Sequence, residues 1–173
     1  GLGDVYKRQD DLSWVDPQEL PLLNGACRTP VRLRVDRVVD GDTIHGKLIT
    51  EQGELDPNLS KIRLIGVDAP EMGYNGDPDD CYAAEATEFA NSLWGSWVWL
   101  TFDGQCTDDF GRMLAYVHLG TGEQDFFQRQ LLRGGYAKAF AWEDTSGFRE
   151  LFAADEATAM SSGAGGWTAC GWN

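Results

Sequence analysis

Alternation of apolar and polar side chains along residues 31–36 is the feature that most constrains the fold of this chain. Its apolar positions alternate with charged ones, and they are Val31, Leu33 and Val35. Because successive side chains of a β-strand point to opposite faces, this segment is predicted to be a strand with one buried face. An Asp-Gly-Asp turn at residues 40–42 and a second extended segment at residues 43–48 complete a predicted hairpin.

The rest of the chain mixes short strand patterns with helical ones. Further strands are predicted at residues 61–67, 97–102 and 111–119, and helices at residues 82–93, 124–132 and 148–160. We therefore predict an α+β, mainly β, fold: a five-stranded OB-type barrel that carries three helices.

One folded domain is predicted at residues 30–173, after an extended lead-in at residues 10–29. The 173 residues are enough for one well-buried core and too few for two comfortable ones. Residues 1–9 look foreign to the rest and are expected to be a non-native, adapter-derived segment, with a native polar tail as the alternative. If this segment is foreign, the natural N-terminus and any signal region are missing.

Acidic residues dominate the charge balance: 28 aspartates and glutamates against 14 lysines and arginines give a formal net charge of −14. Non-specific binding to nucleic acid draws its affinity from neutralising phosphates, so composition alone argues against it. The acidity favours cation binding, a salty habitat or simple solubility. No apolar run approaches the ~20 residues of a membrane-spanning helix, so no membrane span is expected.

The run RLIGVDAPE, which begins at Arg63, carries the most unusual set of polar side chains. Arg63 stands among apolar neighbours on a predicted central strand, so its charge must be paired or face a cavity. Asp68 and Glu71 crowd the end of that strand, and with Asp42 they offer the oxygen ligands that Ca²⁺ or Mg²⁺ prefers. Arg63 and Arg112 can each bind two oxygens of a phosphate. These residue types suit hydrolysis of a phosphodiester bond.

Three motifs together resemble the staphylococcal nuclease (thermonuclease) family: DGDT at residues 40–43, RLIGVDAPE at residues 63–71 and DDFGRMLAYV at residues 108–117. They stand in the family's order with similar spacing, and the likeness runs from about Val31 to Trp167. The resemblance implies the five-stranded OB-type barrel with three helices. It also implies cleavage of DNA and RNA with Ca²⁺ as cofactor, leaving 3′-phosphates.

The resemblance further implies a Ca²⁺ site. Asp42 and Asp68 match the family's carboxylate ligands, and Ala69 stands where the family contributes a backbone carbonyl. The family has threonine at that position, but a carbonyl ligand does not depend on the side chain. Thr43 and Glu71 are expected to reach the ion through water.

Catalytic roles are implied in the same way. Glu71 matches the family's proposed general base, which activates water. Arg63 and Arg112 match the pair of arginines that bind the phosphate and stabilise the transition state. Every catalytic position is filled by the expected residue type.

The departures from the family fall on substrate contacts. The basic loop that often follows the general base is replaced by GYNGDPDD at residues 73–80. Asp109 and Phe110 stand where lysine and tyrosine commonly meet a terminal phosphate. Phe140 and Trp142 are candidates to stack on a base, although the family's Tyr-x-Tyr is not reproduced. The chemistry is therefore better supported than the affinity for substrate.

The four cysteines form no CxxC pair, and an even number in a small domain suits two disulfides in an oxidising compartment. Four buried thiols in a cytosolic protein are the alternative. The resemblance places Cys81 and Cys106 at the same edge of the site, so we predict the bridges Cys81–Cys106 and Cys27–Cys170. A bacterial protein that is secreted or lies in the periplasm or cell envelope is expected.

We therefore expect a monomeric, calcium-dependent endonuclease that acts on DNA and RNA with little sequence preference. The alternative from another class is a catalytically weak OB-fold module that binds nucleic acid or another partner. A calcium-binding structural domain is a third possibility. Loss of Arg63, Glu71 or Arg112 would favour the module, and all three are present.

Overall fold

The computed structural model describes residues 10–141 and 147–173, and its centre is a closed barrel of five strands. The strands are β1 (Val31–Asp40), β2 (Thr43–Leu48), β3 (Ser60–Leu64), β5 (Trp97–Thr101) and β6 (Met113–His118). Their order is β1-β2-β3-β6-β5, and neighbours are antiparallel except for the parallel pair β3 and β6. The predicted OB-type barrel and the hairpin at its start are confirmed. The expected adapter-derived segment, residues 1–9, lies outside the described residues.

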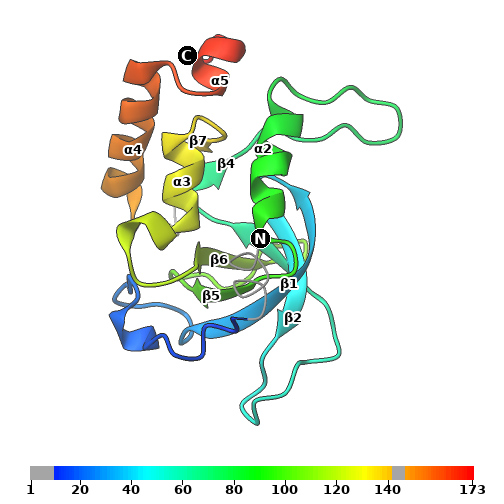
Figure 1. The fold of residues 1–173 in the computed structure, drawn as a ribbon, viewed down its shortest axis with the longest axis vertical. Helices are drawn as coiled ribbons and strands as arrows, with labels where there is room; N and C mark the ends of the chain where they lie inside the picture. The colour runs from blue at the N-terminus through cyan, green and yellow to red at the C-terminus, as the bar shows by residue number, and fades with distance from the viewer. Residues whose placement is uncertain (1–9, 142–146) are drawn as a thin grey trace.

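Within the described residues, three helices longer than one turn cover one end of the barrel. They are α2 (Ala83–Ala90), α3 (Phe127–Arg133) and α4 (Arg149–Ser162). Figure 1 shows them standing together above the barrel, with the short helix α5 (Gly166–Ala169) near the C-terminus. Single 3₁₀ turns form η1 (Pro17–Glu19), η2 (Asn91–Leu93) and η3 (Glu123–Asp125). The three predicted helices are therefore confirmed, although the first ends early and continues as η2.

A second, two-stranded sheet pairs β4 (Val67–Asp68) with β7 (Lys138–Ala139) outside the barrel. It exists because the third predicted strand is broken at Gly66. That residue has a φ of +83°, and a Cβ there would lie 2.4 Å from the Phe152 ring, so only glycine fits. The break leaves Arg63 on the barrel and carries Asp68 into the second sheet.

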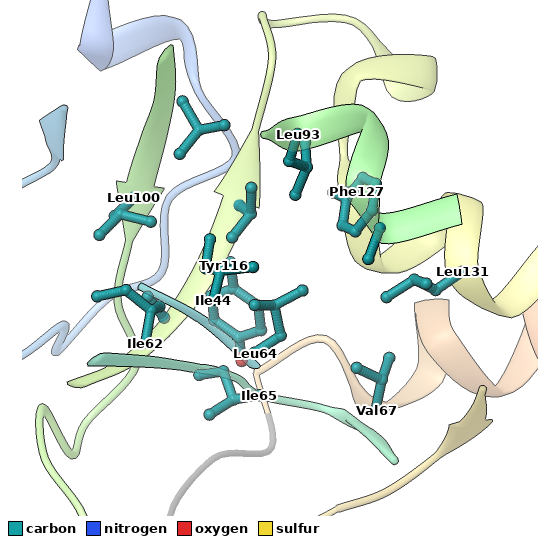
Figure 2. Close-up of a cluster of buried hydrophobic side chains, with 14 of the residues drawn as sticks. Ile44, Ile62, Leu64, Ile65, Val67, Leu93, Leu100, Tyr116, Phe127 and Leu131 are labelled. Carbon is teal, nitrogen blue, oxygen red and sulfur yellow. The ribbon is translucent and has the colours of Figure 1, made fainter. Parts of the chain in front are cut away.

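Aliphatic side chains from all five strands fill the barrel, and aromatic side chains pack where the helices meet it. Figure 2 shows part of this core, including Ile44, Ile62, Leu64, Leu100 and Tyr116. Phe127 of α3 stacks on Phe89 of α2 with ring centroids 5.4 Å apart. Each fully buried aliphatic side chain contributes about 1.5–3 kcal/mol, so this core stabilises the barrel that carries the polar residues.

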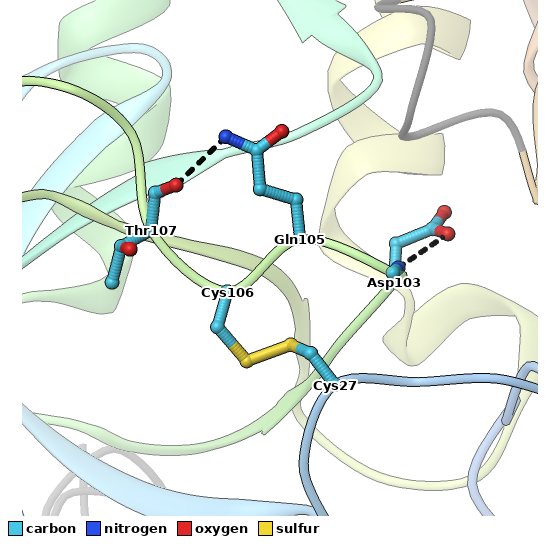
Figure 3. The surroundings of a disulfide bond; sticks show 6 residues. Cys27, Asp103, Gln105, Cys106 and Thr107 are labelled. Carbon is cyan, nitrogen blue, oxygen red and sulfur yellow. Dashed lines mark hydrogen bonds between the residues drawn. A yellow bond between two sulfur atoms is a disulfide. The ribbon is translucent and has the colours of Figure 1, made fainter.

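The predicted disulfide partners are wrong, although all four cysteines are bonded as expected. The bridges are Cys27–Cys106 and Cys81–Cys170. Figure 3 shows the Cys27–Cys106 bridge. Cys27 reaches Cys106 because the lead-in runs beside the segment that follows β5, where the Cys27 N–H donates to the Asp103 carbonyl at 2.8 Å. Cys170 follows α5 and bonds to Cys81, two residues before the start of α2. The lead-in and the segment after α5 are therefore each bonded to the domain and not to each other.

Candidate active site

The turn between β1 and β2 fixes Asp42 at the mouth of the barrel. Its backbone N–H donates to Asp40 Oδ1 at 3.1 Å, so the Asp40 side chain stabilises the turn. Gly41 allows close packing, because a Cβ there would lie 2.8 Å from the Ala69 Cβ. Asp42 Oδ2 accepts the Ala69 N–H at 2.7 Å, and Oδ1 accepts the Thr43 hydroxyl at 3.1 Å. The carboxylate is thus held in one position, and Asp42 is only 4% exposed.

Arg63 of β3 joins Asp42 to the second sheet. Its Nη2 lies 3.2 Å from Asp42 Oδ2 and 3.6 Å from Asp68 Oδ1. Its Nη1 donates to the carbonyls of Leu64 and Val67, the latter at 2.9 Å. The expectation that this buried charge is paired is confirmed, and its partners are the two aspartates that the sequence singled out.

Burial raises the pKa values of both aspartates. It raises the pKa of Asp42 to about 6, although the Arg63 guanidinium acts in the opposite direction. Burial is also the largest cause of the raised pKa of Asp68, and the neighbouring charge of Asp42 is the next. One guanidinium therefore compensates the two carboxylates incompletely, and a further cation beside them would stabilise their charged forms.

The donor atoms around this pair suit a hard cation. Asp42 and Asp68 offer carboxylate oxygens, and the Ala69 carbonyl and Thr43 hydroxyl belong to the adjoining residues. Within residues 10–141 and 147–173, no three His, Cys, Asp or Glu side chains gather closely enough to hold a metal ion. A bound ion would need carbonyl and water oxygens to complete its shell, as Ca²⁺ commonly does. The residues present fit Ca²⁺ in this sense.

An open cleft of about 340 Å³ lies beside Asp68. Its lining residues are Asp68, Ala69, Pro70, Glu71, Asp80, Cys81, Lys138 and Trp172. Glu71 belongs to the segment between β4 and α2, which projects as a loop beside the start of α2 (Figure 1). The Glu71 N–H donates to Asp80 Oδ2 at 3.0 Å, and the Asp80 N–H donates to the Glu71 carbonyl at 2.9 Å. The Glu71 carboxylate is exposed and forms no hydrogen bond or ion pair with another described residue, so it can accept a proton from water.

Arg112 directly precedes β6, the strand beside β3, and has different partners. Its Nε forms an ion pair with Asp108 Oδ2 at 2.7 Å, and its guanidinium lies 5.5 Å from the centre of the Phe110 ring. It lines a separate surface cavity of about 360 Å³ with Phe110 and Lys61. Among the described residues, Arg112 forms no ion pair with the aspartates that hold Arg63. The structure therefore joins Asp42 and Asp68 to Arg63, whereas the ion pair of Arg112 is with Asp108.

Three of the predicted substrate contacts, Asp109, Phe110 and Phe140, do not line the cleft that holds Glu71. Phe110 is 81% exposed, and Asp109 is exposed in the same turn. Phe140 is 45% exposed and borders a separate apolar cavity of about 100 Å³. Trp142 lies outside the described residues.

Sequence reasoning missed three residues that line the cleft: Asp80, Lys138 and Trp172. Lys138 lies in the cleft because β7 pairs with β4, a segment far from it in the chain. Trp172 lies there because the Cys81–Cys170 bridge holds the C-terminal segment beside the cleft. No local sequence pattern indicates either contact. Only the acidic run that contains Asp80 could have been connected to the site, because it directly follows the Glu71 segment.

The fold and the site define an OB-type barrel domain with carboxylate and guanidinium groups gathered at its mouth. The family described as staphylococcal nuclease homologue matches residues 61–169. The chain therefore belongs to the staphylococcal nuclease homologue family.

Individual relatives agree with this assignment. The chain is 37% identical over 107 residues to a protein named thermonuclease from Staphylococcus hyicus, covering 61% of this chain and 57% of that protein. It is 36% identical over 118 residues to a thermonuclease from Staphylococcus intermedius, covering 68% and 64%. It is 31% identical over 148 residues to endonuclease YncB from Bacillus subtilis (strain 168), covering 82% and 64%. The chain thus spans between 57% and 64% of the length of these three relatives.

Proposed function

We propose that this chain is a calcium-dependent endonuclease that hydrolyses phosphodiester bonds of DNA and RNA with little sequence preference. One observation carries the proposal: Arg63 lies within 3.6 Å of both Asp42 and Asp68, and the cleft beside Asp68 also holds Glu71. A hard-cation donor set, a guanidinium and an available carboxylate are the groups that hydrolysis of a phosphodiester requires. The family membership and the names of the relatives support the same reaction.

In the proposed reaction, the Glu71 carboxylate takes a proton from a water molecule, and the water oxygen attacks phosphorus. The bond between phosphorus and the 5′-oxygen breaks, the 5′-oxygen takes a proton from solvent, and a 3′-phosphate remains. The positive charge of the Arg63 guanidinium stabilises the negative charge that grows on the phosphate oxygens in the transition state. Arg112 joins it by exchanging part of its contact with Asp108 for the phosphate.

Asp42, Asp68 and the Ala69 carbonyl would hold Ca²⁺ directly, with Thr43 and Glu71 reaching it through water. When bound, the ion supplies positive charge beside the scissile phosphate and favours the ionised forms of both aspartates. The chain's own part is to keep these oxygens together, which the hydrogen bonds of Asp42 already do.

A monomeric protein of an oxidising compartment is part of the proposal, either secreted or in the periplasm or cell envelope. The two disulfides support this location, because disulfides persist in such compartments. Among the described residues, no helix has the length and apolar character to cross a membrane.

A binding module that has lost turnover is the second candidate. The net charge of −14 and the acidic residues of the loop after Glu71 oppose a polyanionic substrate, so they favour a module that binds another partner. Turnover separates the two candidates, because only the nuclease cleaves DNA.

The test is cleavage of supercoiled plasmid with Ca²⁺ or with EDTA. The proposal expects fragments with Ca²⁺ only, and a fall in rate of about 10³-fold for Glu71→Gln. Glu54→Gln is the matched control: Glu54 is exposed in the loop between β2 and β3, at the end of that hairpin opposite Thr43 and Arg63. Plasmid that is bound but stays intact with Ca²⁺ would favour the binding module.

A further inference from the structure

Lys138 is a cation in a cleft otherwise rich in carboxylates. Asp68, Glu71 and Asp80 line this cleft, and Lys138 contributes the one lysine or arginine among its described lining residues. The strand pairing sets Lys138 directly opposite Asp68, so both side chains share one face of the small sheet. The charge of Lys138 also acts on Asp68, whose pKa it lowers against the effect of burial.

Two indole rings hold the Lys138 ammonium. Its Nζ lies 5.9 Å from the centre of the Trp167 ring and 5.4 Å from that of the Trp172 ring. Both distances lie in the range of a cation–π interaction, which holds a cation without neutralising its charge. Lys138 forms no ion pair with a carboxylate among the described residues. A carboxylate partner would have cancelled the positive charge, whereas the indoles leave it available to an anion.

The wall behind Lys138 is built by the segment that ends at Trp172. A Cβ on Gly166 would lie 2.4 Å from the Trp172 ring, so the ring rests on the backbone of α5. Trp172 also packs edge-on against Trp167 and Tyr82, at 5.5 and 6.3 Å between ring centroids. The Cys81–Cys170 bridge fastens this segment beside the start of α2. The aromatic wall is therefore a fixed part of the cleft.

We propose that Lys138 is a substrate-binding residue that contacts a phosphate next to the scissile one, with Trp167 and Trp172 holding its ammonium toward the cleft. The inference rests on the proposed function, because it takes the cleft that contains Glu71 as the place where the strand lies. A polyanion that enters past three carboxylates needs a local positive charge, and Lys138 supplies it without drawing on the arginines. The contact sets affinity for the strand and leaves the chemical step to the other residues.

The test measures binding and cleavage of a single-stranded DNA of about 12 nucleotides, which exceeds the span of one phosphate contact. Fluorescence anisotropy with Ca²⁺, on a Glu71→Gln background, gives the dissociation constant at several salt concentrations. Lys138→Met should raise the dissociation constant about tenfold, as the loss of one good ionic contact does. The slope of log affinity against log salt should become shallower by about 0.7. In the active protein, KM should rise while kcat changes little.

Two further variants separate a phosphate contact from a structural role. Lys138→Arg keeps the charge and should bind like the parent. Lys47→Met is the matched control, since Lys47 lies on β2 near Asp36, outside the cleft lining. Trp172→Ala should weaken binding in the same direction as Lys138→Met, and Trp172→Phe should restore it. Unchanged affinity and salt slope in Lys138→Met would overturn the inference, as would a weakening that leaves the slope unchanged.

The two proposals can fail separately. If the active protein leaves DNA intact while Lys138→Met still weakens binding with a shallower slope, the nuclease proposal fails and the Lys138 contact stands. If the protein cleaves DNA and Lys138→Met behaves like Lys47→Met, the Lys138 contact fails alone. Thermal unfolding of each variant verifies that the compared proteins are folded.

Discussion

Gly41 sets how closely the turn that carries Asp42 packs onto its neighbours. A Cβ built on Gly41 would lie 2.8 Å from the Ala69 Cβ and 3.1 Å from the Ala86 Cβ. Non-bonded carbon atoms prefer about 3.5–4.0 Å, so in Gly41→Ala the turn must move by up to about 1 Å. Both neighbours are buried, and neither methyl group can rotate away. Overpacking of this kind costs about 1–3 kcal/mol, and we expect a loss of about 2 kcal/mol in the free energy of unfolding.

The same movement should impair the site. It pulls Asp42 Oδ2 away from the Ala69 N–H, now at 2.7 Å, and disturbs the ion pair of Asp42 with Arg63. Urea unfolding measures the stability of Gly41→Ala, and plasmid cleavage at saturating Ca²⁺ measures its activity. We expect activity to fall at temperatures where the variant is still fully folded.

Removal of the methyl group that causes the clash provides the decisive comparison. Ala69→Gly alone should destabilise, because it deletes a buried methyl group and adds backbone freedom. In the double variant Gly41→Ala/Ala69→Gly, the new methyl group occupies the space of the old one. The combined loss should therefore be smaller than the sum of the single losses by about 1 kcal/mol or more. Strict additivity, or a Gly41→Ala protein as stable as the parent, would refute the packing argument.

Two predictions concern groups away from the cleft. Burial lowers the pKa of His118 from 6.5 to about 3, so the stability due to its neutral form is complete above pH 6.5 and lost as pH falls toward 3. Between pH 7 and pH 5 the free energy of unfolding of the parent should fall by about 2 kcal/mol more than that of His118→Gln. Urea unfolding at both pH values measures this difference, and parallel pH profiles of the two proteins would contradict it. Asp155→Ala should cost about 3 kcal/mol, because it removes the buried carboxylate that binds Arg129 at 2.8 Å. Glu123→Ala, at a 58%-exposed partner of Arg129, should cost much less than Asp155→Ala, and the reverse ranking in urea unfolding would contradict the argument.

The parts of the fold that the sequence predicted correctly are those with a local physical signal. The alternation that begins at Val31 and the Asp-Gly-Asp turn each depend on neighbours within a few residues, and both appear in the barrel. The pairing of Arg63 was predictable because a buried charge among apolar neighbours must find a partner. That this partner is Asp42 follows from the register of β2 against β3, which sets Thr43 opposite Arg63.

What the sequence did not predict depends on segments that meet only in the folded chain. No residue near Gly66 in the sequence indicates that Phe152 of α4 packs against Gly66, where the strand ends. The disulfide partners were wrong because the course of the lead-in around the barrel decides which cysteine Cys27 meets. The role of Lys138 was not foreseen either, since its partners are Asp68 across the small sheet and indoles near the C-terminus.

An acidic chain can bind a polyanion only through cations placed where the phosphate lies, and the partners of each cation indicate what it contributes. Arg63 is fixed by two aspartates and two carbonyls, so it cannot follow the substrate, and it should act where charge develops in the transition state. Arg112 is held by Asp108, and it must exchange that ion pair to reach a phosphate, which reduces its net gain in binding. Lys138 is held by indole faces and has no ion pair among the described residues to break before it binds a phosphate. Changes at Lys138 should therefore appear mainly in KM, and changes at Arg63 mainly in kcat.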